Sequence, residues 1–351
     1  MEQFLAALKS EIQLYAFYGS KEKIETIFFG GGTPSLLSPS TVSDILRQLS
    51  ATFNISSDAE ITLETNPGTV DQQKLEGYRA ADVNRLSFGI QSFHDDELKF
   101  LTRIHNSSEA TSAVRMAKQA GFTNINVDLI FALPNQTMER WKDNLQRAVE
   151  LNTQHISAYN LIVEDNTPLA RLVSAKQVSS LPSETEAEMY SFTMDVLQRE
   201  GFEHYEVSNY CKPGFHSRHN MNYWNHSNYL GFGPSAHSYW ATKRWWNVSN
   251  IRSYCEKLSA GILPVVGDEH LNRNQLMDEH VMLGLRSNGV DLHRLHDMLG
   301  VDVLASHRST IQSIIDDRLA ILDNAVLRLT YKGFLLCDEI TRRLLTNISC
   351  S

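Results

Sequence analysis

The chain has 351 residues and a formal net charge of −9, with 21% charged and 42% hydrophobic residues. This acidic balance excludes a nonspecific nucleic-acid binder, which needs a basic face. The chain contains no run of 18 apolar residues, so the sequence predicts no membrane span. Its length predicts about two domains.

The N-terminal segment MEQFLAALKSEIQLYAF predicts an amphipathic helix and no targeting signal. Phe4, Leu8, Ile12 and Tyr15 recur at helical spacing. The segment has no apolar core like that of a secretory signal, and it is not rich in arginine. We therefore expect a cytoplasmic protein.

Five short apolar segments in the first half predict buried parallel strands, because they are rich in β-branched and aromatic residues. Predicted helices lie between them. Such a β-α series implies a parallel sheet with outer helices, either an open doubly wound sheet or part of a (β/α) barrel. The predicted strands are Ile24–Phe29, Glu60–Glu64, Arg85–Ile90, Ile125–Ile130 and His155–Ile162.

The intervening helices carry recognisable end signals. One begins near Ser38-Pro39, with proline at its first position. Another runs from about Ser108 to Ala120 and ends before Gly121. A third follows Thr137 and presents an apolar face: Trp141, Leu145 and Ala148.

The second half predicts less regular structure. Ser183 and Glu186 match a capping box at the start of a further helix. A stretch rich in aromatic residues and histidine follows. The last region is predicted to be helical and to end in a β-like hairpin over 325–345, which gives it a winged-helix-like end.

Unusual residues follow the predicted strands, where ligands bind in both kinds of parallel sheet. Gly30–Pro34 follows the first strand, and Glu64–Pro67 ends the second. Gln91–Phe93 ends the third, and we place Asp128 at the end of the fourth. Their polar groups are expected to converge on one small polar ligand.

Each of these residues also has an ordinary structural interpretation. The glycines can form a tight βα turn, and they match neither a Walker loop nor GxGxxG. Glu64 can be a surface acid. Arg103 can hold a carboxylate through two hydrogen bonds or can be a solvated cation. Only their shared position at successive strand ends favours a ligand site.

A second unusual stretch is His219–Trp224, with the sequence HNMNYW. Five histidines lie between positions 204 and 237, and histidine is a usual ligand of haem iron and zinc. For any single histidine, a loop side chain bonded to backbone groups is the alternative. Zinc is a weaker interpretation, because the spacing of His216, His219 and His226 fits no familiar zinc pattern.

Several motifs together resemble the radical S-adenosylmethionine family of HemN and HemW, and the chain is more similar to HemW. They are FGGGTPSLL, ETNPGT, RLSFGIQSF, LTRIH, NVDLIFALPNQT, SRHNMNYW and YLGFGPSAHSY. The resemblance covers nearly the whole chain. It implies a partial (β/α)6 TIM-like barrel, here lacking its first strand, and an α+β C-terminal domain.

The resemblance also implies ligands for particular residues. HNMNYW matches an HNxxYW signature of haem binding, with His219 as candidate iron ligand and Asn220, Tyr223 and Trp224 beside it. Residues implied to bind S-adenosylmethionine are Gly31, Gly32, Thr33, Glu64, Gln91, Arg103 and Asp128.

The chain departs from the family pattern at its start. The family opens with a strand and a CxxxCxxC loop whose thiolates hold a [4Fe–4S] cluster, whereas Met1 begins at the helix expected after that loop. Fe–S clusters need cysteine thiolates, so we expect this chain not to hold the cluster. The remaining cysteines are few and scattered: Cys211, Cys255, Cys337 and Cys350.

Three functions therefore stay open. The protein is a HemW-like haem chaperone that delivers haem to acceptor proteins, an oxygen-independent coproporphyrinogen III oxidase, or an incomplete and inactive product. The family resemblance also allows a homodimer. We predict three regions: a partial barrel over 1–165, the rest of the barrel with the HNxxYW stretch over 166–267, and a HemN-type C-terminal domain over 268–351.

Overall fold

A computed structural model describes residues 1–19 and 22–345, so Cys350 lies outside the described residues. The chain divides into two compact units. Unit 1 comprises Met1–Glu25, Asp44–Ala59 and Ser217–Ser351, and unit 2 comprises Thr26–Ser43 and Glu60–His216. The predicted boundaries near residues 165 and 267 stay a prediction.

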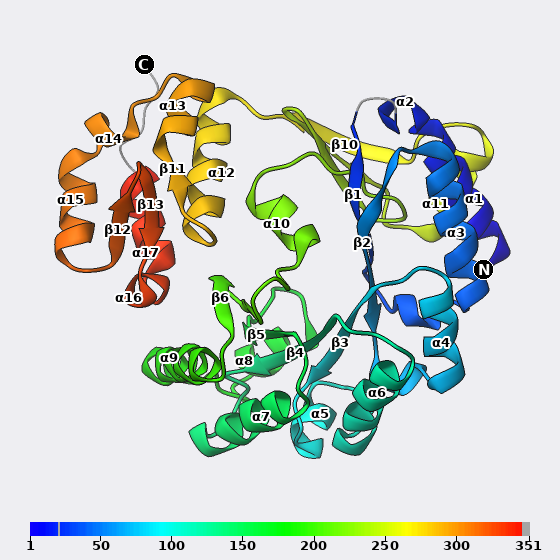
Figure 1. Cartoon of the computed structure of the whole chain (residues 1–351), viewed down its shortest axis with the longest axis horizontal. Coiled ribbons are helices and arrows are strands. Elements are labelled where there is room, and N and C mark those ends of the chain that lie inside the picture. The colour runs from blue at the N-terminus through cyan, green and yellow to red at the C-terminus, as the bar shows by residue number, and fades with distance from the viewer. Residues whose placement is uncertain (20–21, 346–351) are drawn as a thin grey trace. The chain divides into compact units, whose positions relative to one another are not determined.

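The main sheet has seven strands in the order β1-β2-β3-β4-β5-β7-β6 (Figure 1). Strands β2 to β5 pair in parallel, whereas β7 pairs antiparallel with β5 and β6. This mostly parallel sheet confirms the predicted partial barrel. Its strands are β1 Ile24–Phe29, β2 Ile55–Thr65, β3 Arg85–Gln91, β4 Ile125–Phe131, β5 His155–Asn160, β6 Glu203–Glu206 and β7 Asn209–Cys211.

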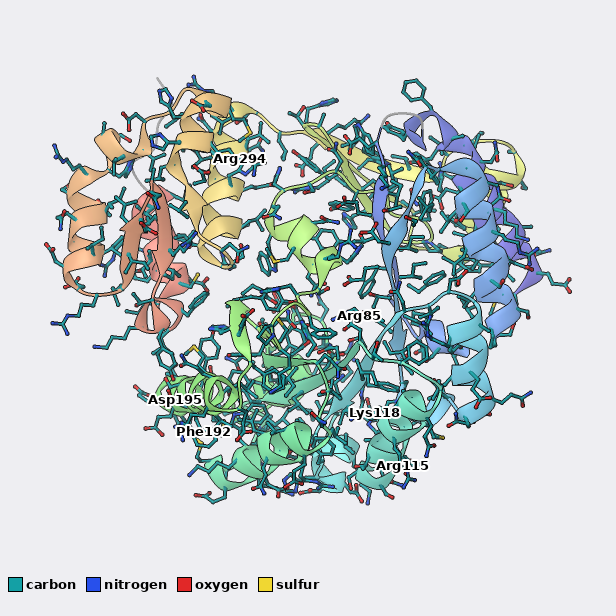
Figure 2. All side chains as sticks on the ribbon, in the orientation of Figure 1. Arg85, Arg115, Lys118, Phe192, Asp195 and Arg294 are labelled. Atoms are coloured by element: carbon teal, nitrogen blue, oxygen red, sulfur yellow. The ribbon has the colours of Figure 1, made fainter. Side chains whose placement is uncertain are left out.

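Along the central strands, apolar and polar side chains alternate, so the main sheet has one apolar face and one polar face. On β3, Leu86, Phe88 and Ile90 are fully buried, and α6 packs against this strand. Arg85 and Ser87 point to the opposite face, because successive side chains of a strand alternate. Arg85 is only 2% exposed, in contrast to the exposed cations of α6 labelled with it in Figure 2, Arg115 and Lys118.

The helices of unit 2 begin largely where the sequence predicts. Thr137 caps α7 by accepting the backbone N–H of Arg140. The capping box predicted at Ser183 is wrong. Pro182 occupies the cap position of α9, and the Glu186 carboxylate instead accepts a bond from Asn160 at 3.1 Å. The bounds are α4 Gln72–Ala80, α5 Asp95–Phe100, α6 Ser107–Gln119, α7 Met138–Glu150, α8 Pro168–Ser174 and α9 Ser183–Arg199.

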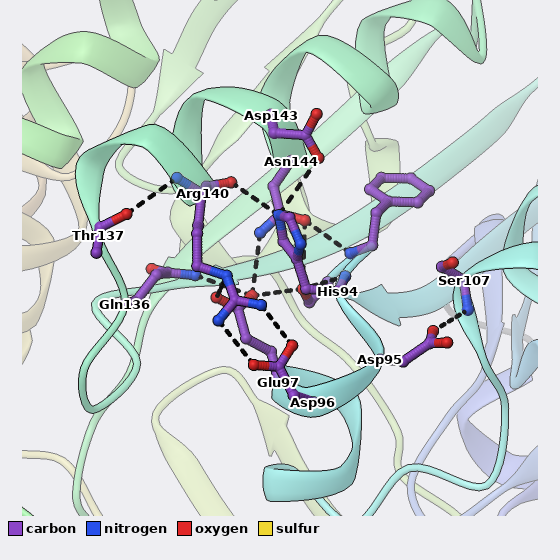
Figure 3. A network of polar contacts seen from close by, with 12 residues as sticks. His94, Asp95, Asp96, Glu97, Ser107, Gln136, Thr137, Arg140, Asp143 and Asn144 are labelled. Atoms are coloured by element: carbon purple, nitrogen blue, oxygen red, sulfur yellow. Dashed lines mark hydrogen bonds and ion pairs between the residues drawn. The ribbon is translucent and has the colours of Figure 1, made fainter.

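A polar network joins α5 to α7 directly after β3 (Figure 3). The guanidinium of Arg140 bonds both carboxylate oxygens of Asp96 and lies 3.6 Å from the buried Glu97. Asn144 accepts the backbone N–H of Phe93 at 2.6 Å. These contacts fix the segment that follows Gln91, so they hold the end of β3 in place.

Unit 1 contains a buried carboxylate that links several of its segments. Glu11 of α1 is fully buried. It accepts the Gly233 N–H at 2.8 Å, the Asn247 amide at 2.6 Å and the Tyr254 hydroxyl at 2.5 Å. Its helices are α1 Glu2–Leu14, α2 Ala16–Gly19, α10 Arg218–Trp224, α11 Ile251–Ser259 and most of α3 Pro39–Thr52, which enters unit 1 at Asp44. Its sheet comprises β8 His237–Trp240, β9 Lys243–Asn247 and β10 Val265–His270.

The C-terminal region has its own core and a small sheet in the order β11-β13-β12. The hairpin predicted over 325–345 is wrong, because only Val326–Leu329 is a strand there. Thr330 then caps a helical turn, and Ile340 and Leu344 bury one face of a final helix. The bounds are α12 Arg273–Leu285, β11 Val290–Asp291, α13 Leu292–Leu299, α14 Val303–Ser306, α15 Arg308–Asp316, β12 Ala320–Asp323, β13 Val326–Leu329, α16 Tyr331–Phe334 and α17 Cys337–Leu345.

No helix within residues 1–19 and 22–345 is both long and apolar enough to cross a membrane.

Candidate functional site

The glycine loop after β1 leaves its backbone open. Gly31 and Gly32 have φ of 74° and 55°, a region that glycine enters without steric cost. A Cβ at either position would meet nothing within 4 Å. A Cβ at Gly30, by contrast, would lie 2.6 Å from the Phe28 ring and 3.3 Å from the Glu64 side chain. The loop therefore packs on one side and offers a free surface on the other.

Glu64 at the end of β2 connects this loop to the next strands. Its carboxylate accepts the Gly31 N–H at 3.1 Å. Burial raises the pKa of Glu64, and the nearby Asp128 carboxylate raises it further. Two neighbouring carboxyl groups that are partly withdrawn from water disfavour a second negative charge. A cationic ligand or hydroxyl donors would relieve that repulsion.

Asp128 lies within β4 and not at its end, so that part of the prediction is wrong. Its oxygens accept bonds from Ser87 at 3.0 Å and from Asn126 at 2.7 Å. Burial raises the pKa of Asp128 despite these bonds. The side chain reaches the site because it belongs to the polar face of the sheet.

Gly89, Gln91 and Arg103 complete the group. The Arg103 guanidinium donates to the Gly89 carbonyl at 3.2 Å. A Cβ at Gly89 would lie 2.8 Å from that guanidinium and 2.9 Å from the Gln91 amide, so both side chains need the glycine. Gln91 has a φ of 71° at an irregularity in the β3–β4 pairing. Strain of this kind in a residue other than glycine recurs at functional sites.

These residues form one connected group, which we call the strand-end site. Asp128 also interacts electrostatically with Arg103, and the Nε of Arg103 is buried without a hydrogen-bond partner among the described residues. Thr33 lies between the glycines and the short helix η1 (Pro34–Leu36). The strand-end site comprises Gly31, Gly32, Glu64, Gln91, Arg103 and Asp128.

Sequence reasoning missed a polar network on the same face of the sheet. Asn126 donates to Ser87 at 2.7 Å and to Ser157 at 2.9 Å, and its amide oxygen lies 2.6 Å from Nδ1 of His155. Nε2 of His155 meets the Tyr205 hydroxyl at 2.7 Å. Burial lowers the pKa of His155 well below its ordinary value, so the imidazole is neutral.

The signal for this network was present in the sequence. Polar residues alternate inside apolar strands as RxS on β3, NxD on β4 and HxS on β5. The strand register then aligns them, because Ser87 pairs with Asn126 and Asn126 with His155. Fully buried parallel strands are normally apolar on both faces, so this alternation indicates a face that borders a polar interior.

The HNMNYW stretch forms the short helix α10 in unit 1. Ser217 caps it by accepting the Asn220 N–H. His219 and Tyr223 are four residues apart and face the same side, with Nε2 of the imidazole 3.1 Å from the phenol oxygen. Tyr223 remains 42% exposed and packs edge-on against Tyr229 at 4.8 Å. We call His219 and Tyr223 the α10 face.

Trp224 does not join the α10 face. It lines a separate hollow formed with residues of α12 and α13, including His280, Leu295 and Met298. The structure thus brings together two of the four predicted haem residues, His219 and Tyr223, and places Trp224 in a separate hollow.

Two family models match this chain and show its class of protein. A family model described as the radical SAM superfamily matches residues 9–148, and one described as the HemN C-terminal domain matches residues 271–336. The fold resembles the solved structure of coproporphyrinogen III oxidase HemN from Escherichia coli, with a TM-score of 0.83. The structural match covers 99% of this chain and 83% of the HemN chain, with 23% sequence identity.

Curated relatives define the family within this class. The heme chaperone HemW of Bacillus subtilis is 32% identical over 97% of this chain and 90% of its own length. The heme chaperone HemW of Mycobacterium tuberculosis is 35% identical over 98% of this chain and 86% of its own. The chain belongs to the HemW family.

Radical SAM proteins as a class use S-adenosylmethionine and a [4Fe–4S] cluster, and the described cysteines do not fit such a cluster. They lie on three different elements: Cys211 on β7, Cys255 on α11 and Cys337 on α17. Among residues 1–19 and 22–345, one group of three clustered His, Cys, Asp or Glu side chains occurs, and it contains a single cysteine. The strand-end site, in contrast, fits a small polar cation.

Proposed function

We propose that this protein is a cytoplasmic haem chaperone, which binds haem at the α10 face and delivers it to acceptor proteins. The relatives in its family carry the name heme chaperone. The observation that carries the proposal for this chain is the pair formed by His219 and Tyr223. An imidazole beside an exposed aromatic surface suits a flat macrocycle that carries an iron ion.

The test is a haemin titration of the purified protein, followed by the Soret band. Wild type is expected to bind, and His219→Ala is expected to lose the shifted band because the iron loses its axial ligand. His237→Ala is the matched control, since His237 is an exposed histidine of the same unit. An unshifted band in wild type, or a normal one in His219→Ala, contradicts the proposal.

We also propose that the strand-end site binds S-adenosylmethionine. The carboxylates of Glu64 and Asp128 suit its sulfonium, ammonium and ribose hydroxyl groups, and Arg103 suits its carboxylate. Gln91 and the open backbone of Gly31–Thr33 would hold the methionine end. The two neighbouring carboxyl groups and the unpartnered Nε of Arg103 support this ligand.

Calorimetric titration with S-adenosylmethionine and S-adenosylhomocysteine tests this site, because only the first carries a sulfonium charge. Glu64→Gln is expected to weaken S-adenosylmethionine binding by about tenfold, a loss of about 1.4 kcal/mol. Its effect on the binding of S-adenosylhomocysteine, a neutral thioether, should be smaller. Glu76→Gln on α4 is the control. Equal effects of Glu64→Gln on both ligands would contradict a role for charge.

Binding of haem acceptors and formation of a homodimer stay predictions from the family resemblance. Oxidation of coproporphyrinogen III remains the alternative activity, and an anaerobic decarboxylation assay distinguishes it from haem binding alone.

A further inference from the structure

The antiparallel strands β6 and β7 place an acid opposite a cysteine. Glu203 and Cys211 are direct cross-strand partners. Side chains at opposed positions of an antiparallel pair lie on the same face, with Cβ atoms about 5 Å apart. The carboxylate and the thiol therefore lie on the same face of the β6–β7 pair.

A tight turn then returns the chain to this surface. Phe215 donates its N–H to the Lys212 carbonyl at 3.0 Å, and Gly214 has a φ of 83°. With Pro213 at the second position and glycine at the third, the sequence suits a type II turn. His216 follows directly and lies beside the pair, with its Nε2 3.4 Å from the Glu203 carboxylate.

The three side chains supply donor atoms of different kinds at one point. The Cys211 sulfur, a carboxylate oxygen of Glu203 and an imidazole nitrogen of His216 all lie within 4.8 Å of one another. A tetrahedral zinc ion with bonds of about 2.0 to 2.3 Å holds its ligand atoms roughly 3 to 4 Å apart. The 3.4 Å between Nε2 of His216 and the Glu203 carboxylate already lies within that range.

Surrounding groups position two of these side chains. Pairing of β7 with both β5 and β6 fixes the position of Cys211. The His216 ring packs edge-on against Tyr205 at 4.6 Å, and the Tyr205 hydroxyl is held by His155 at 2.7 Å. Such outer contacts orient metal ligands in proteins.

Charge and exposure also favour a cation here. The Glu203 carboxylate places a negative charge beside the Cys211 sulfur and the His216 imidazole. The nearby Lys212 ammonium does not form an ion pair with these three side chains. It donates to the Glu200 carbonyl and lies over the Phe202 ring. The side chains of Glu203 and His216 are 49% and 40% exposed, so an ion can enter from solvent.

We propose that Glu203, Cys211 and His216 bind a single transition-metal ion, with Zn²⁺ as the natural occupant of this sulfur, nitrogen and oxygen donor set. Three protein ligands leave a fourth position open to water or to a further donor. The alternative is a surface ion pair beside an ordinary buried thiol. This site lies in unit 2 and does not depend on the α10 face.

Cobalt substitution tests the proposal on the full chain. Titration with Co²⁺ is expected to give visible bands of a four-coordinate ion and a near-ultraviolet band from charge transfer between sulfur and cobalt, and Zn²⁺ is expected to displace both. Cys211→Ser should lose the charge-transfer band. Cys337→Ser is the matched control, because Cys337 is also buried. Absence of the band in wild type, or its persistence in Cys211→Ser, overturns the proposal.

The exposed ligands give a second test that does not disturb the core. His216→Ala and Glu203→Gln are each expected to weaken Co²⁺ binding by about tenfold or more. His296→Ala is the matched control, since His296 also lies beside a carboxylate, at 3.5 Å from Asp297. Unchanged affinity in both ligand variants contradicts the site. His219→Ala should bind Co²⁺ normally, which separates this outcome from that of the haem proposal.

Discussion

The strand-end site of unit 2 and the α10 face of unit 1 present their polar groups in opposite ways. In the strand-end site, partly buried carboxyl groups are fixed by hydrogen bonds and by the pairing of parallel strands. On the α10 face, His219 and Tyr223 project from a helix of seven residues and remain partly exposed. The difference teaches that pairing of parallel strands holds polar groups in a fixed and partly buried arrangement, whereas a short helix leaves them open to solvent.

The largest expected effect is the loss of a buried acceptor. Asp128→Ala removes the acceptor of the Ser87 hydroxyl and one acceptor of the Asn126 amide. The buried Ser87 hydroxyl then lacks a hydrogen-bond acceptor. We expect a loss of roughly 3 kcal/mol in the free energy of unfolding together with loss of S-adenosylmethionine binding. Urea denaturation and calorimetric titration measure the two effects.

Arg115→Ala on the exposed face of α6 is the control for Asp128→Ala, and it should change stability by less than about 0.5 kcal/mol. If Asp128→Ala changed the free energy of unfolding as little, the polar face of the sheet would not be held in a fixed arrangement by its hydrogen bonds.

The second prediction concerns pH and the fully buried Glu206, whose oxygens accept bonds from Ser208 and Asn209. Burial raises the pKa of Glu206 from 4.5 to about 8. Between these values the folded state keeps a proton that the unfolded state has released. The contribution of Glu206 to the free energy of unfolding is therefore full below pH 4.5 and is lost as the pH rises through 8. The slope is at most about 1.4 kcal/mol per pH unit.

Denaturation of wild type and Glu206→Gln at pH 5 to 8 measures this slope. The variant is expected to flatten the profile, because the amide does not titrate. Glu184→Gln on the exposed first turn of α9 should keep the wild-type slope. Parallel profiles for wild type and Glu206→Gln would show that the interior of unit 2 is more polar than its burial indicates.

The third prediction separates strain from binding at Gln91. Glycine adopts the φ of 71° at this position without steric cost. The free energy of unfolding of Gln91→Gly is therefore expected to rise by about 1 kcal/mol. Affinity for S-adenosylmethionine should fall, since the amide beside Gly89 is lost. Thermal unfolding and calorimetry give the two values, and a variant that loses stability and keeps its affinity contradicts this assignment.

The smallest effect is expected on the α10 face. Tyr223→Phe removes the hydrogen bond to Nε2 of His219, which must break before that nitrogen can bind iron. Haem affinity should rise by roughly threefold to tenfold, corresponding to about 1 kcal/mol. Stability should stay within about 0.5 kcal/mol of wild type because Tyr223 is exposed. Haemin titration provides the measurement, and a tenfold loss would mean that the hydroxyl itself contacts the ligand.

The sequence determined the elements of this protein more fully than their contacts. Short apolar runs rich in β-branched and aromatic residues predicted β1 to β5, and the Pro39 and Thr137 signals predicted the starts of α3 and α7. The sequence-based prediction is wrong at 331–345, where the structure has the helices α16 and α17 in place of a strand. Short apolar runs are ambiguous between the two periods, and only packing of Ile340 and Leu344 in the C-terminal core settles the matter.

Chain order also indicated which residues share the strand ends, because parallel strands have their carboxyl ends on one edge. The tertiary structure alone decided the contacts. Strand register aligned Asn126 with His155, and cross-strand pairing set Glu203 opposite Cys211. Periodicity fixes which face a side chain occupies, whereas its neighbours on that face depend on pairing between segments far apart in sequence, and no local pattern encodes that pairing.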